Sequence, residues 1–173
     1  VNITGGPPPS PASGNAADVW TRYFDLMVQP VVRLTDRVLP HMRQSGWGRV
    51  VTSTSSGVVA PIPNLALSNS LRSALVGWSK TLAREVAADG VTVNNVLPGY
   101  TNTARLEKLF AAKADKSGQM PDAVSKAALE QVPMRRFAEP EETAAAIAFL
   151  ASPSAAYITG VSLPVDGGRL HAI

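Results

Sequence analysis

Residues 48–57 read Gly48-Arg49-Val50-Val51-Thr52-Ser53-Thr54-Ser55-Ser56-Gly57. The run of β-branched residues is typical of a buried strand, and the small hydroxyl residues after it indicate a loop at its carboxyl end. A second strand pattern covers residues 91–97, and a long helical pattern lies between the two over residues 66–88. This alternation of strand and helix predicts an α/β domain with a parallel sheet.

A further helix is expected from Asp18 to about residue 44, because apolar residues recur there at helical spacing. One stripe of this helix should face a core or a partner subunit. Pro30 should kink the helix or lie where its missing hydrogen bond is tolerated, and Gly46 should end it. The stripe consists of Trp20, Phe24, Met27, Val28, Val31, Thr35, Val38 and Met42.

The remaining segments carry weaker signals. Residues 7–15 are rich in Pro, Ser and Gly and predict a loop. Residues 104–132 predict one or two short helices. The sequence Glu139-Pro140-Glu141-Glu142 should open a last helix, because Pro fits the first turn and carboxylates stabilise the positive end of the helix dipole. No internal repeat and no second domain are evident.

Composition excludes several classes of protein. With 173 residues and 45% hydrophobic content, the chain is long enough for one core. The net charge of +3 comes from scattered basic residues, so nucleic-acid binding is not expected. No apolar run reaches the roughly 18 residues of a membrane span, so no membrane partner is expected. Without cysteine, a disulfide scaffold and a thiolate metal site are excluded, and no metal is expected.

Several blocks, taken in order, resemble the short-chain dehydrogenase/reductase family. Residues 48–57 resemble its fifth strand, and residues 73–85 its long helix after the catalytic Tyr and Lys. Residues 91–100 are similar to its sixth strand and Pro-Gly turn. Residues 136–168 contain blocks similar to its C-terminal signature. The resemblance implies a doubly wound, Rossmann-like parallel sheet, with residues 1–173 forming part of a single domain.

The start of the chain resembles the end of the family's fourth strand. The residues are Val1-Asn2-Ile3-Thr4-Gly5-Gly6, where the family has Asn-Asn-Ala-Gly. The family places a glycine-rich pyrophosphate turn, and the residue that selects NAD or NADP, before this point. No such turn follows an apolar strand elsewhere in the chain. We therefore expect the N-terminal βαβαβ half of the domain to be missing from this chain.

The catalytic positions of the family fall on altered residues. The Tyr-x-x-x-Lys motif aligns with Ser68 and Arg72, and the catalytic serine, thirteen residues before the tyrosine, aligns with Ser55. In the family the tyrosine transfers the proton, the lysine lowers its pKa and holds the nicotinamide ribose, and the serine binds the substrate oxygen. Only Ser55 keeps its residue type. The family's asparagine on helix four is replaced by Met27.

The resemblance also implies a cofactor, NADP or NAD, and its contacts. The turn at Pro98 and Gly99, together with Thr103, would meet the nicotinamide, and Arg72 would meet its ribose. The adenosine side of the crevice would include Asn2 and Gly5. Ser55 and Tyr100 would contact the substrate. These residues could also have plainer roles, with Ser55 capping a strand end, Thr103 capping a helix, and Tyr100 forming an aromatic wall rather than acting as the acid.

Taken together, the sequence predicts a cytoplasmic NAD(P)-dependent oxidoreductase that acts on a small carbonyl compound or secondary alcohol, similar by analogy to 3-oxoacyl reductases. The helices expected over 18–44 and 66–88 resemble the faces through which the family forms homodimers and homotetramers. Two alternatives stay open because the catalytic positions are altered. The protein could be a catalytically degenerate member that binds nucleotide or a small ligand, or a structural subunit.

Overall fold

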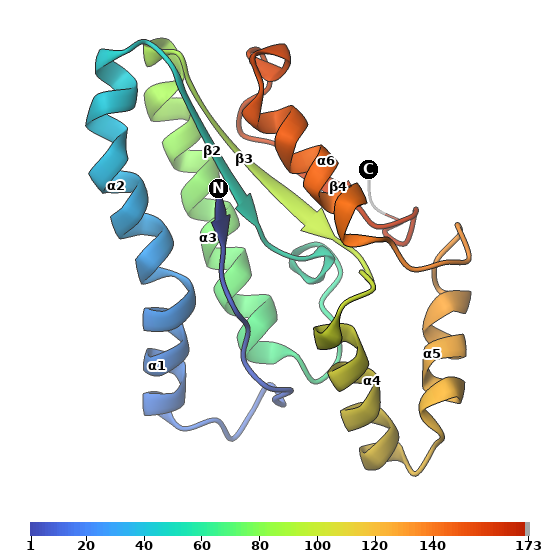
Figure 1. Cartoon of the computed structure of the whole chain (residues 1–173). Helices are drawn as coiled ribbons and strands as arrows, with labels where there is room; N and C mark the ends of the chain where they lie inside the picture. Colours follow the sequence, from blue (N-terminus) through green and yellow to red (C-terminus); the bar gives the residue numbers. More distant parts are fainter. Residues whose placement is uncertain (172–173) are drawn as a thin grey trace.

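The computed structural model describes residues 1–171, and its centre is a sheet of four parallel strands in the order β1-β2-β3-β4 (Figure 1). The two central strands confirm the strand predictions, with β3 one residue longer than expected. Both are almost entirely buried, as parallel strands covered on both faces must be. The strands are β1 (Asn2–Ile3), β2 (Gly48–Ser53), β3 (Val91–Pro98) and β4 (Ser162–Val165).

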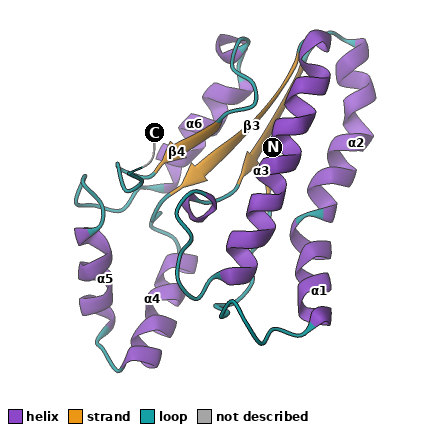
Figure 2. Ribbon diagram, turned by 180° about the vertical axis from the view of Figure 1, so that it is seen from behind, coloured by secondary structure: helices purple, strands orange, loops and turns teal. Residues whose placement is uncertain are grey.

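Helices cover both faces of the sheet (Figures 1 and 2). Successive residues of β2 point to opposite faces: Val50 packs in a cluster with α2 and α3, and Val51 packs in a cluster with Leu150 of α6. This arrangement confirms the predicted α/β parallel sheet. The helices on one face are α1 (Ala17–Met27), α2 (Gln29–Gln44) and α3 (Ala66–Val86), and the helix on the other face is α6 (Pro140–Ala151).

The single helix expected over residues 18–44 is in fact two helices, α1 and α2, joined at Val28. Pro30 lies in the first turn of α2, where its backbone nitrogen has no partner to lose, so the second alternative for this proline is confirmed. The helix pair is fixed by Met27, Val28 and Val31, which are buried against α3.

Two residues of the predicted apolar stripe, which was expected to face a core or a partner subunit, lie outside the core of the chain. Phe24 is 38% exposed and Val38 is 45% exposed, whereas Leu39 is buried. The break at Val28 restarts the helix, so the face of α2 that meets the sheet is shifted relative to one continuous helix. None of the helices within residues 1–171 is long and apolar enough to cross a membrane.

Two further helices, α4 (Ala104–Ser117) and α5 (Pro121–Glu130), extend beyond the carboxyl end of the sheet (Figure 1). Residues 104–132 thus form two helices, as one of the two alternatives predicted. They pack mainly against each other around a small core of their own. This core consists of Leu106, Phe110, Ala114, Val124 and Ala128, with Tyr100, Leu109 and Phe137 packed against it.

Buried amides tie β3 to its neighbours. The Asn94 side chain donates to the Ile158 carbonyl at 2.8 Å and accepts from the Val161 backbone nitrogen at 3.1 Å, which fixes the loop that leads into β4. On the opposite face, the Ser79 hydroxyl of α3 donates to the Asn95 amide oxygen at 3.1 Å. Because these groups are shielded from water, each would be costly to leave without a partner.

The turn after α3 requires glycine at residue 90. Gly90 has φ +73°, and a Cβ there would collide with the Gly46 carbonyl oxygen. We expect Gly90→Ala to lower the free energy of unfolding by about 2 kcal/mol or more, through left-handed strain and the collision. Gly77→Ala is the matched control, because Gly77 is exposed in mid-helix with no atom within 4 Å of its would-be Cβ. The control should be neutral or stabilising by up to about 1 kcal/mol in urea unfolding. Equal destabilisation of both variants would contradict this account.

Candidate active site

A cleft of about 770 Å³ opens at the carboxyl ends of β1, β2 and β3. Ligands of open parallel sheets bind at this edge, because the loops that follow the strands converge there. Its walls include residues 6–9, 53–56 and 98–101 from these loops, residues of α3, α4 and α6, and Arg169 from the C-terminal segment.

Ser55 lies on the cleft wall, two residues after the end of β2. Its Oγ accepts a hydrogen bond from the Gly57 backbone nitrogen at 3.0 Å and so caps the short 3₁₀ helix Ser56–Val58. The residue thus caps a short helix, whereas the plainer interpretation expected it to cap a strand end. A serine hydroxyl that accepts one bond can still donate its proton, so Ser55 remains able to bond a ligand oxygen in the cleft.

Ser68 and Arg72 lie one turn apart on α3, and both line the cleft. Arg72 Nε donates to Ser68 Oγ at 3.3 Å. The other nitrogens of the guanidinium donate to main-chain oxygens at the ends of two strands: Nη2 to Gly5 at 2.9 Å and Nη1 to Ser53 at 3.3 Å. Arg72 thereby joins α3 to the loops after β1 and β2.

The Arg72 side chain is only 7% exposed, and no ion pair within the described residues includes it. Burial, and next the nearby positive charge of Arg105, lower the pKa of the Arg72 guanidinium to about 10. The group is still a cation at neutral pH. Because its charge has no carboxylate partner there, it favours a ligand that brings negative charge or hydroxyl oxygens.

The turn after β3 is packed tightly against β4. The Gly99 backbone nitrogen donates to the Val165 carbonyl at 2.9 Å, and a Cβ on Gly99 would lie 2.7 Å from the Asp166 Cα. Any other residue would push the turn away from the strand. Pro98 and Gly99 consequently form a fixed part of the cleft wall.

Thr103 occupies the N-cap position of α4 with an extended backbone, as the plainer interpretation predicted. Its side chain, however, makes no capping bond, since its Oγ1 donates to the Thr101 carbonyl at 3.3 Å. The exposed Thr103 side chain also lines the cleft. It is therefore placed where a ligand could take its hydroxyl as a partner.

Tyr100 forms part of an aromatic cluster. Its ring centroid lies 5.8 Å from that of Phe110 and 5.9 Å from that of Phe137. The Arg169 guanidinium lies 4.8 Å from the Tyr100 ring centroid and donates from Nη1 to Ser56 Oγ at 3.0 Å. This packing is that of an aromatic wall. Arg169 was missed by sequence reasoning, because no local pattern links it to a serine 113 residues earlier in the chain.

Two of the predicted cofactor-binding residues do not line the cleft. The Asn2 side-chain amide bonds the Thr52 hydroxyl at 3.4 Å, within the sheet. Gly5 contributes its carbonyl oxygen to Arg72, and the neighbouring Gly6 lines the cleft in its place. The remaining predicted residues come together around one cavity: Ser55, Ser68, Arg72, Pro98, Gly99, Tyr100 and Thr103.

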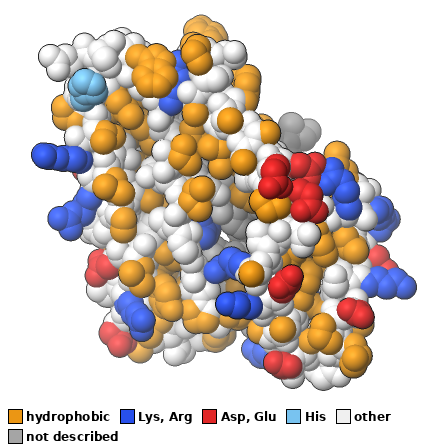
Figure 3. Space-filling view, viewed as in Figure 1, with side chains coloured by type: hydrophobic (Ala, Val, Ile, Leu, Met, Phe, Trp, Pro, Cys, Tyr) orange, Lys and Arg blue, Asp and Glu red, His pale blue; other side chains and the backbone are white. Residues whose placement is uncertain are grey.

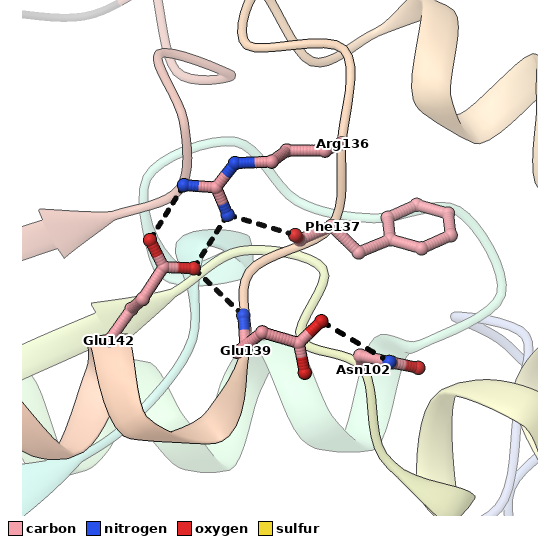
Figure 4. Close-up of polar contacts among 5 residues, drawn as sticks. All are labelled: Asn102, Arg136, Phe137, Glu139 and Glu142. Carbon is pink, nitrogen blue, oxygen red and sulfur yellow. Dashed lines mark hydrogen bonds and ion pairs between the residues drawn. The ribbon is translucent and has the colours of Figure 1, made fainter.

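The N-terminus of α6 anchors the turn that carries Tyr100 (Figure 4). Glu142 accepts both terminal nitrogens of Arg136 at 2.6 Å and the Glu139 backbone nitrogen at 2.8 Å. Asn102 donates to the Glu139 carboxylate at 3.4 Å. The hydrogen bonds from Arg136 and from the Glu139 backbone lower the pKa of Glu142 to about 2. This polar network holds one rim of the cleft in place.

Comparison with known proteins supports the family and the fold. Residues 1–169 match the model of a family described as enoyl-(acyl carrier protein) reductase. The 3-oxoacyl-[acyl-carrier-protein] reductase of Vibrio cholerae is 38% identical over 86% of the chain, and a dehydrogenase/reductase SDR family member 4 from Oryctolagus cuniculus is 34% identical over 87%. The chain covers 57% and 55% of these two relatives.

The structure superposes well on solved oxidoreductases. L-sorbose reductase from Gluconobacter frateurii, complexed with NADPH and L-sorbose, has a TM-score of 0.89 and 32% sequence identity. The match covers 99% of this chain and 66% of that reductase. The α/β fold with its parallel sheet is therefore shared with these proteins over nearly all of this chain.

The ion pair of Glu142 predicts a pH dependence. The folded-state pKa of Glu142 is lowered from 4.5 to about 2, so the unfolded chain binds the proton first as the pH falls. The stabilisation is present above about pH 4.5 and is lost between there and about pH 2. We expect Glu142→Gln to flatten the fall in melting temperature over this range, whereas Glu141→Gln, a neighbouring exposed carboxylate, should leave it unchanged. A wild-type slope in Glu142→Gln would contradict this prediction.

Proposed function

We propose, from the premise that this chain belongs to the short-chain dehydrogenase/reductase family, that the protein is an NAD(P)-dependent oxidoreductase acting on a carbonyl compound or secondary alcohol. The observation that carries this proposal is the convergence of Ser55, Ser68, Arg72 and the Gly99 turn on one cleft at the carboxyl ends of the strands. By analogy with the Vibrio cholerae relative, 3-oxoacyl compounds are the first substrates to test.

The residues present fit the nicotinamide end of NAD or NADP. The hydroxyl oxygens of Thr101 and Thr143, both on the cleft wall, are buried without a partner among the described residues. Arg72 would bind the ribose hydroxyls, and Gly99 and Thr103 would flank the nicotinamide. When bound, the nicotinamide supplies or accepts the hydride. We place the adenosine side of the cleft at Gly6 rather than at Asn2.

Ser55 would donate a hydrogen bond to the substrate oxygen and stabilise the negative charge that develops there. Ser68 stands at the family's proton-donor position, but an aliphatic hydroxyl is a far weaker acid than a phenol with a pKa of about 10. The bond that Arg72 donates to Ser68 Oγ would polarise this hydroxyl and bring positive charge near the reacting oxygen. Turnover by this pair should be slow.

The altered residues favour a second candidate function. Ser68, Arg72 and Met27 depart together from the family's catalytic set, while the cleft itself is retained. A catalytically degenerate member would keep such a cleft for binding nucleotide or another small ligand. A structural subunit is the remaining possibility, in which the chain contributes mainly its helices.

We further propose that the protein is cytoplasmic and acts as a homodimer or homotetramer through the helices of residues 18–44 and 66–88. The support for assembly is the apolar surface of α1 and α2, where Phe24, Leu34 and Val38 are 38%, 61% and 45% exposed. Covering such side chains would remove apolar area from water.

The catalytic assignment is tested by Ser55→Ala in the full-length protein. Loss of the hydroxyl should lower kcat/KM for ketone reduction by roughly 10²-fold, because one donor to the developing oxyanion is removed. Ser73→Ala is the matched control, since Ser73 is exposed on α3 and, within residues 1–171, its hydroxyl bonds only the Asn69 carbonyl. Turnover would be followed as NADPH and NADH oxidation over a panel of ketones. An active Ser55→Ala with unchanged kcat/KM would show that the assignment is wrong.

Introducing a tyrosine and a lysine at positions 68 and 72 tests whether the protein is a catalytically degenerate member of the family. Ser68→Tyr combined with Arg72→Lys should raise kcat by about 10²- to 10⁴-fold if the rest of the site is intact, because a positioned acid contributes that much. Each single variant serves as a control for the other. Activity that appears only in the double variant would favour the catalytically degenerate member. A wild-type protein that is already as fast as the double variant would show that the proton comes from another group.

A further inference from the structure

The charged side chains that line the cleft are all positive. Its lining includes four cations and not one Asp or Glu among the described residues, although the whole chain has 16 basic and 13 acidic residues. Figure 3 shows Lys and Arg side chains gathered at the hollow in the middle of this face. Composition alone does not account for this concentration. The four cations are Arg72, Arg105, Lys108 and Arg169.

Arg169 is held in place but is not neutralised. One nitrogen bonds Ser56 Oγ and the guanidinium covers the Tyr100 ring, while its Nε is buried without a partner among the described residues. The neighbouring carboxylate of Asp166 accepts the backbone nitrogens of Gly168 at 3.0 Å and Leu170 at 2.8 Å. No ion pair within residues 1–171 involves Arg169.

The other cations repel one another across the cleft. Arg105 lies directly over the loop after β1, where a Cβ on Gly6 would collide with its guanidinium. Its charge is one of the two causes that lower the pKa of Arg72. Like charges held around a partly enclosed cavity focus their field into it and attract anions. An anion in the cleft would relieve this repulsion.

We propose that the substrate carries an anionic group, a carboxylate or a phosphate, and that Arg169 binds this group beside Ser56. The inference rests on the proposed function, since it names the substrate class of the same cleft. Ser56 follows Ser55 directly and both line the same cleft, so the anionic group and the reacting oxygen would belong to one small molecule. The substrate is therefore a short oxo acid or a small phosphorylated ketone, or the corresponding alcohol.

Arg105 and Lys108 have a different part in this proposal. Both are exposed at the start of α4, at the mouth of the cleft. They would attract the charged substrate from solution and balance the phosphates of the cofactor. Arg169, whose guanidinium lies over the Tyr100 ring, is the cation that would discriminate between charged and neutral substrates.

The test uses matched pairs of probes with the full-length protein. Acetoacetate is compared with methyl acetoacetate, and dihydroxyacetone phosphate with dihydroxyacetone. We expect kcat/KM to be about 10- to 100-fold higher for the charged member of at least one pair, the range of a charge-assisted hydrogen bond. The pair that responds identifies carboxylate or phosphate. Equal values within both pairs would overturn the proposal.

Variants assign the preference to a residue. Arg169→Gln should bring the charged-to-neutral ratio of kcat/KM close to one, and Arg169→Lys should restore part of it, since lysine keeps the charge but not the planar fork. Arg84→Gln removes an exposed arginine on α3 outside the cleft and should leave the ratio unchanged. An unchanged ratio in Arg169→Gln would overturn the assignment.

A binding measurement separates this inference from the proposed function. Acetoacetate and inorganic phosphate are titrated calorimetrically into the protein with and without saturating NADPH, at ionic strength matched with sodium chloride. Binding that needs Arg169 but is followed by no turnover would uphold the anion site and refute the oxidoreductase. Turnover of neutral ketones without anion binding would support the oxidoreductase and overturn the anion site. Anion binding that saturating NADPH abolishes would assign Arg169 to a cofactor phosphate and overturn the inference.

Discussion

The arrangement of the site depends on the hydrogen bonds of the buried Arg72 guanidinium. It bonds main-chain oxygens of Gly5 and Ser53, at the ends of β1 and β2, and the side chain of Ser68 on its own helix. A charged group without a carboxylate partner is costly to bury, and carbonyl oxygens offset only part of that cost. The same bonds that hold the strand ends together therefore leave the cleft with an uncompensated positive charge.

The sheet with α3 and α6 is well packed, whereas α4 and α5 are less enclosed. β2 and β3 are covered by α3 on one face and by α6 on the other, and buried amides of Asn94 and Asn95 fix β3 to its neighbours. In contrast, α4 and α5 pack chiefly on each other beyond the sheet. Elements with so few contacts to the main core can shift relative to it at low cost. The cleft thus has one rigid wall and one wall suited to closing over a ligand.

The side chains of the cleft are better suited to binding a ligand than to transferring a proton. The Ser68 hydroxyl is a weak proton donor, and the planar Arg72 guanidinium is already bonded to protein acceptors. Positive charge, in turn, is concentrated by Arg105, Lys108 and Arg169. Ligand binding and proton transfer depend on different side chains. The cleft can therefore bind a ligand well even where its proton transfer is slow.

Elements with local signals could be predicted from the amino-acid sequence. The strand at 48–53, the helix from residue 66 and the helix start within 139–142 follow from β-branched runs, apolar periodicity and residues that favour a first turn, whereas over 104–132 the sequence left one helix or two open. Three features are evident only in the folded chain: the break of the 18–44 helix at Val28, the bond of Asn2 within the sheet, and the bond of Arg169 to Ser56 across 113 residues of sequence. Periodicity and capping act within a few residues along the chain. Where a side chain points, and which distant charge it meets, is set by packing between elements that no local pattern specifies.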